Sequence, residues 1–289
     1  MNSSAFPATS GLHLRRQGMG DRQGTGLREP LLPAVDHRHA TGILQVLARI
    51  RRYIIELLAY ILYRIQSLLL LGSDSTPQLS PTQSSRWLAL KRRASIQYDA
   101  ADATHVALLG RLWIAGFQTE EAMPRRVKAE CWKDMGWQSD DPGRDFRGGG
   151  LLSLECLVYA AEEHPATFQS LMQKRDGKRS DWEYPFAAAG VNLTFMLAGL
   201  LGLSRASPTT PAGRIFASFL EDSDGFEAFA SLVVAAQVLL DRIWLEKRAS
   251  YMEFQAVLRE TQEQLEGQLT QLLPGQGPEV LLLRLKDDS

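Results

Sequence analysis

Hydrophobic positions recur at spacings of three and four residues along most of the chain, which predicts helices. The spacing is sustained over 87–117, 226–245 and 249–272, and no series of alternating positions or internal repeat interrupts it. His105 lies on the apolar face of the first stretch, where a hydrogen-bonded core histidine is expected. We therefore expect an all-α, multi-helix domain over 87–273.

The middle of this domain contains further predicted helices. A short helix around 121–135 should end at Gly136, and another over 151–163 should end before a His-Pro pair, because residues before proline disfavour helix. The stretch 184–204 is uncharged and long enough to span a bilayer. Its asparagine, proline and three glycines favour a buried core helix instead, in which Asn192 would need internal partners.

The chain outside the domain has a different character. Residues 1–42, rich in Gly, Pro, Ser and Arg, are expected to form a disordered basic arm. An amphipathic helix over 43–72 and a linker over 73–86 should follow. The tail 274–289 is expected to add a short strand or to dock loosely.

The N-terminal helix has a narrow polar stripe on a broadly apolar surface. Five charged residues interrupt the run over 43–71, so that it is a poor membrane span. Two interpretations remain open. The helix docks onto the main domain, or it lies in a membrane interface with Arg49, Arg51 and Arg52 near anionic head groups.

The composition of the chain argues against several classes of function. Hydrophobic residues make up 45% and charged residues 22%, which is ordinary for a globular protein, and the net charge of −1 gives no support for nucleic-acid binding. Cys131 and Cys156 form no disulfide framework, so a cytoplasmic protein is expected. The histidines lack metal-ligand spacing with the cysteines, and no GK[ST] follows the glycine run, so we expect neither a metal nor a nucleotide cofactor.

One inter-helix stretch, 132–150, combines glycine, aromatic and charged residues unusually densely. Its glycines at 148–150 permit close backbone approach, and the following helix presents free N–H groups and a positive dipole end to the same loop. Arg147 offers a planar charged fork for a carboxylate or phosphate. In the alternative, Arg147 only rigidifies the loop through an ion pair. The candidate acids are Asp140, Asp141 and Asp145.

The pattern W-x3-G-aromatic-Q-x3-P-x2-D-F-R-G-x-G resembles the signature of the ELMO (engulfment and cell motility) domain. Here it is filled by Trp132, Gly136, Trp137, Gln138, Pro142, Asp145, Phe146, Arg147, Gly148 and Gly150. Segments at 160–165, 184–194 and 240–244 are also similar to the family, so that the resemblance covers roughly 87–272.

The resemblance implies an all-helical fold and a regulator of enzymes rather than an enzyme. Short members of the family resemble GTPase-activating proteins for Arf-family and Arf-like GTPases, and the arginine of their DFRG motif corresponds to Arg147. This chain resembles that short class. It departs from the pattern at Trp137, where phenylalanine is usual, and at Arg144, where threonine is usual, which leaves open which arginine would act.

Three functional hypotheses follow. The protein supplies Arg147 in trans to a small GTPase, or it binds a GTPase or exchange factor in membrane traffic or cytoskeletal signalling without accelerating hydrolysis. In a third hypothesis, membrane recruitment through 43–71 dominates. In each, the protein is cytoplasmic or peripheral on an intracellular membrane. The residues expected to be buried scaffold are Trp132, Phe146, Asn192 and Trp244.

Overall fold

The chain divides into two units, residues 1–54 and 55–289. The computed structural model describes residues 51, 78–121, 123, 130–173, 183–272 and 276–287. Arg51, the one described residue of the predicted N-terminal helix, has helical backbone. The rest of that helix and the predicted basic arm over 1–42 lie outside the described residues.

Every regular element of the described residues is helical, which confirms the all-α expectation. The α-helices are α2 (Pro81–Ala94), α3 (Ala103–Phe117), α4 (Gly150–Glu163), α5 (Pro165–Gln173), α6 (Phe186–Leu201), α7 (Pro211–Phe219), α8 (Gly225–Lys247), α9 (Phe254–Thr270) and α10 (Glu279–Asp287). Three short 3-10 helices join them: η1 (Glu130–Met135), η2 (Pro142–Arg147) and η3 (Tyr251–Glu253).

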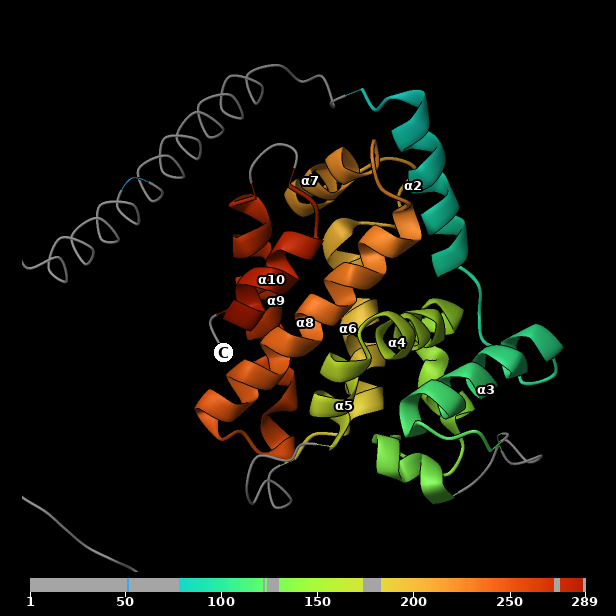
Figure 1. Cartoon of the computed structure of the whole chain (residues 1–289). Helices are drawn as coiled ribbons and strands as arrows, with labels where there is room; N and C mark the ends of the chain where they lie inside the picture. Colours follow the sequence, from blue (N-terminus) through green and yellow to red (C-terminus); the bar gives the residue numbers. More distant parts are fainter. Residues whose placement is uncertain are drawn as a thin grey trace, which may run out of the picture. The chain divides into compact units, whose positions relative to one another are not determined.

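Helix α8 is the centre of the bundle. Residues 228–237 are buried on every side of it, as expected for a helix that other helices surround. It contacts α4 and α6 as well as α9 and α10, and the two pairs flank it in Figure 1. Among the described helices, α8 alone is long and apolar enough to cross a membrane. However, 78% of its most apolar window is buried inside the protein, as in a core helix.

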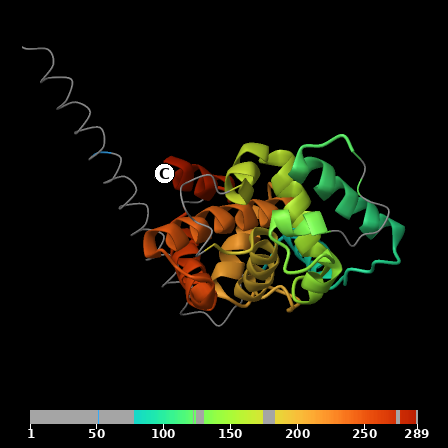
Figure 2. The same ribbon diagram turned by 90° about the horizontal axis from the view of Figure 1, so that it is seen from below.

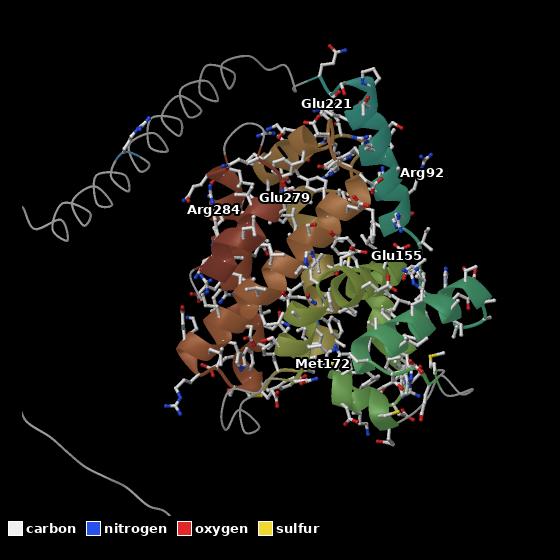
Figure 3. The ribbon with its side chains drawn as sticks, in the orientation of Figure 1. Arg92, Glu155, Met172, Glu221, Glu279 and Arg284 are labelled. Carbon is white, nitrogen blue, oxygen red and sulfur yellow. The ribbon has the colours of Figure 1, made fainter. Side chains whose placement is uncertain are left out.

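Helices α4 and α6 form the next layer, and α3 lies at the edge of the bundle against α4 (Figure 2). The helix predicted over 151–163 and the buried core helix predicted within 184–204 are both confirmed as α4 and α6, and both are buried along most of their lengths. The C-terminal end of α2 is tied to α4 by an ion pair between Arg93 Nε and Glu155 Oε2 at 2.6 Å, and Figure 3 labels Glu155. These contacts fix the beginning of α4, where the arginine motif lies.

The prediction of one continuous helix over 87–117 was wrong. The helix breaks over 95–102, and the side chain of Asp102 caps α3 by accepting from the N–H of Thr104. The ring of His105 accepts the N–H of Asp99 at Nδ1 over 3.0 Å, which confirms a hydrogen-bonded core histidine. The break places the 95–102 segment beside the arginine motif.

Two boundaries also differ from the sequence expectation. The predicted linker extended to residue 86, but α2 already begins at Pro81, because Ser80 and Gln83 form a capping box around it. The tail forms helix α10 rather than a strand or a loose segment. Leu281, Leu282 and Leu285 are buried, and the helix packs on α8.

Candidate functional site

The aromatic residues of the motif form a buried row beneath the loop that carries the two arginines. Trp132 is 0% exposed and its ring meets Trp137 edge-on at 6.4 Å between centroids. Trp137 meets Phe146 at 5.1 Å, and Phe146 meets Tyr98 at 4.7 Å. Edge-to-face packing of this kind favours one defined arrangement, so the row gives η2 a fixed support.

The structure also accounts for the departure at Trp137. Its indole N–H has no hydrogen-bond partner among the described residues, and the ring is 3% exposed. The position therefore uses the side chain as an apolar aromatic group, which the usual phenylalanine would also supply.

Gly136 follows η1 and packs against the start of helix α6. Its φ of +86° is in the region that favours glycine, and a Cβ there would collide with the backbone nitrogen of Phe186. Its carbonyl accepts the N–H of Ala188 over 3.2 Å. The helix predicted around 121–135 ends before Gly136 as expected, but its described part is the 3-10 helix η1, and residues 121 and 123 are not helical. Gly136 also allows the two backbones to come into contact.

Replacing Gly136 with alanine should lower the free energy of unfolding by about 2–4 kcal/mol, because it adds an unfavourable φ to a backbone collision. Chemical denaturation of the purified variant would measure the loss. The matched control is Gly199→Ala, which adds a methyl group to helix α6 where nothing lies within 4 Å. It should leave stability unchanged or raise it by up to about 1 kcal/mol. Equal stability of the two variants would contradict the close packing at Gly136.

The acidic residues of the motif hold its backbone. Asp141 precedes η2 and accepts the N–H of Gly143, and its other oxygen lies 3.6 Å from Nε of Arg144. Asp145 accepts the backbone N–H of Gln138 over 3.0 Å. Burial raises the pKa of Asp145, the Gln138 hydrogen bond lowers it, and Asp141 raises it again, with an upward net shift. Arg147 is near enough to act on this carboxyl in the lowering direction.

Arg147 differs from Arg144 in its contacts. Arg147 is exposed and makes no hydrogen bond or ion pair with any residue that the structure describes. Arg144 instead lies beside one of the candidate acids, 3.6 Å from Asp141, in a long ion pair whose arginine side chain is 60% exposed. The structure therefore leaves the Arg147 guanidinium available to a partner.

The backbone that follows Arg147 is held closely on both sides. A Cβ at Gly149 would collide with the side chain of Ser153, and one at Gly150, whose φ is +60°, would lie 2.5 Å from the carbonyl oxygen of Ile96. That same carbonyl accepts the N–H of Leu151 over 2.9 Å. The segment between α2 and α3 thus fixes the first turn of α4.

The remaining motif residues have structural positions. Pro142 is buried at the first position of η2, where proline suits a helix start. Gln138 is exposed and contributes its backbone N–H, while Gly148 is exposed beside Arg147. The ten motif residues thus lie together around one loop, and Arg147 is the charged member whose side chain is exposed and makes no hydrogen bond or ion pair with a described residue.

The scaffold expectations are confirmed for three residues and wrong for one. Trp132, Phe146 and Trp244 are at most 1% exposed. Asn192 is only half-buried, because it lies on the solvent side of α6. Its amide nevertheless has an internal partner, since Nδ2 donates to the carbonyl of Ala188 over 2.8 Å.

A cavity of about 460 Å³ opens elsewhere, between α3, α4 and the start of α8. Both arginines of its lining are engaged internally. Arg93 stacks on Phe226 at 3.9 Å while it pairs with Glu155, and Arg111 pairs with Glu162 at 2.5 Å. These contacts hold helices together, and the cavity lacks the motif residues. Among the described residues, no group of three or more His, Cys, Asp and Glu side chains is placed to hold a metal ion.

Comparison with known proteins places the chain in a family. Residues 88–258 match the ELMO/CED-12 family. The chain is 30% identical to ELMO domain-containing protein C of Dictyostelium discoideum over 213 residues, which are 70% of this chain and 32% of that protein. It is also 30% identical to ELMO domain-containing protein 2 of Mus musculus over 174 residues, 60% of this chain and 56% of the relative. No solved structure matches.

The chain is thus an all-helical domain protein with a glycine-flanked, exposed arginine. It belongs to the ELMO/CED-12 family, which is related to GTPase-regulating proteins. The matched region spans from about a third to somewhat over half of the two relatives named above.

Proposed function

We propose that this protein binds a small GTPase of the Arf or Arf-like family and accelerates its GTP hydrolysis by supplying Arg147 to the nucleotide. The observation that carries the proposal is the contrast between the two arginines. Arg147 is exposed and unpaired among described residues, whereas Arg144 lies beside Asp141. Family membership supports a GTPase as the partner.

The chemistry of hydrolysis explains what Arg147 would contribute. Negative charge shifts among the phosphate oxygens in the transition state, and a guanidinium inserted by a second protein stabilises it, by about 10³–10⁵ in rate. Its planar fork can meet two oxygens at once. The support beneath Arg147 suits this role, because Phe146 is 1% exposed and the backbone after Gly148 is closely packed. A positioned donor loses less entropy on engaging its target.

The direct test is single-turnover GTP hydrolysis by a panel of purified Arf-family GTPases, with and without this protein. We expect faster hydrolysis by at least one member. Nucleotide-dependent binding without faster hydrolysis would favour the non-catalytic interaction module, in which the domain acts as a scaffold or effector. Neither binding nor acceleration across the panel would overturn the proposal.

We also propose that the predicted helix over 43–71 brings the protein to an intracellular membrane. Replacing Arg49, Arg51 and Arg52 by glutamate should release the protein from vesicles that contain anionic lipid, because each arginine contributes about 1 kcal/mol of attraction to such a surface. Vesicle sedimentation measures the bound fraction. A matched variant with three lysines keeps the charge and should stay bound. Unchanged binding of the glutamate variant would mean that the helix has a structural role instead.

A further inference from the structure

Helix α6 is buried on all sides except one narrow stripe. This stripe consists of Asn192, Phe195, Ala198 and Gly199, whose spacing by three or four residues places them on one face. A polar residue is expected at the middle of such a stripe, but Phe195 is found there and is 61% exposed. Gly199, one turn further on, has nothing within 4 Å of the place a side chain would occupy, so the surface beyond the phenyl ring is open.

Phe195 lies directly beside the arginine loop. Its ring carbons are 3.8 and 3.9 Å from the position that a Cβ of Gly148 would take, and Gly148 follows Arg147 in the chain. Ile96 also adjoins the glycine run, through its backbone carbonyl at the start of α4, and is 43% exposed. Two exposed apolar residues, one in contact through its ring and the other through its backbone, therefore adjoin a loop whose central residues have no side chains.

Periodicity in the sequence does not reveal this arrangement. Phe195 belongs to a stretch in which nearly every neighbour is apolar, so periodicity does not reveal which residue faces solvent. Ile96 was assigned to the middle of a continuous helix, and its position became apparent only with the break between α2 and α3.

We propose that Phe195 and Ile96 form an apolar docking surface for the GTP-bound form of the partner GTPase, and that this surface positions Arg147 at the nucleotide. The inference rests on the proposed function and deepens it by naming the residues that recognise the partner. The two parts of the surface have different roles. The two apolar residues contribute binding affinity, and Arg147 accelerates GTP hydrolysis.

Charge and shape complementarity support this occupant. An exposed guanidinium without a partner among described residues complements the phosphates of a bound nucleotide, and Gly148 leaves no side chain to obstruct its approach. The switch segments of a GTPase lie beside the γ-phosphate and are ordered by it, so that a surface adjoining the arginine would meet them. Burial of the phenyl ring against those segments would contribute binding affinity.

The experiment titrates the full chain against one responsive GTPase. It measures the rate of single-turnover GTP hydrolysis and the affinity of the two proteins for each other. Phe195→Ala should increase the half-saturating concentration about ten- to thirtyfold, because exposed aromatic residues are frequent hot spots, and should leave the maximal rate unchanged. Binding to the GTPase loaded with a non-hydrolysable GTP analogue should weaken equally. Phe195→Leu should recover part of the affinity.

Leu283→Ala is the matched control, because this residue of α10 is 60% exposed, almost as much as Phe195. It should change neither the rate nor the affinity. Both variants should melt within about 2 °C of the parent, as surface substitutions usually do.

A half-saturating concentration that is unchanged in Phe195→Ala, with the parent still activating, would overturn the docking surface and leave the proposed function standing. If the parent binds a GTPase without activating it, weaker binding of Phe195→Ala would still support the docking surface. If the parent neither binds nor activates any GTPase tested, both proposals fail.

Discussion

Replacing Arg147 with alanine should remove GTPase activation, a loss of about 10³–10⁵ in the stimulated rate, while affinity for the GTPase remains. The reason is that Arg147 contributes a guanidinium to the transition state and has no hydrogen bond or ion pair to any described residue of its own chain. Single-turnover hydrolysis at saturating protein measures the rate. Arg147→Lys should also fail, because an ammonium cannot reproduce the two-pronged contact.

Arg144→Ala is the control for this substitution. It removes an equal charge three residues away, from an arginine that lies 3.6 Å from Asp141, and should leave most of the activation intact. Thermal unfolding of both variants separates catalysis from structure. An inactive Arg147→Ala protein that has also lost several kcal/mol of stability would indicate that Arg147 supports the fold. A fully active one would leave the interaction module as the better account.

Replacing Trp132 with alanine should lower the free energy of unfolding by about 3–5 kcal/mol, because a fully buried aromatic side chain is exchanged for a cavity. The ring is 0% exposed and meets Trp113 at 4.9 Å, in addition to Trp137. Urea denaturation gives the value. Tyr251→Ala is a suitable control, since that aromatic residue is 56% exposed and should cost little. Near-parental stability of Trp132→Ala would show that the row of rings does not support the loop.

The sequence predicted long helices well where an apolar stripe or run was sustained. Helices α4, α6 and α8 lie close to their expected bounds, because their burial imposes one consistent pattern over many residues. Short helices were missed. Helix α7 begins at Pro211 after a capping Thr210, in a stretch whose prolines and polar residues suggested only a turn. Helix α10 lies in the tail for which the sequence predicted a short strand or loose docking, since an isolated apolar run does not distinguish strand from helix.

The candidate site was predictable in part. The resemblance to the ELMO signature singled out Arg147 and the glycines, whereas the residues alone left open whether Arg147 or Arg144 would act. That choice depends on where Asp141 and Asp145 direct their oxygens, and one caps η2 while the other accepts from Gln138. The apolar flanks at Ile96 and Phe195 come from segments distant in sequence, which only the packing of α6 and of the 95–102 segment brings together.

The close packing of the glycines has a consequence for how this surface can diverge. The backbone around Arg147 is fixed by Phe146 on one side and by the contacts of Gly149 and Gly150 on the other, and the arginine side chain makes no hydrogen bond or ion pair with a described residue there. Substitution at position 147 should therefore have little effect on folding stability, whereas substitution of its neighbours should destabilise the protein. A single substitution at this position can therefore remove or restore the arginine without changing the fold. A GTPase activator and a binding protein that does not accelerate hydrolysis would then differ at one residue.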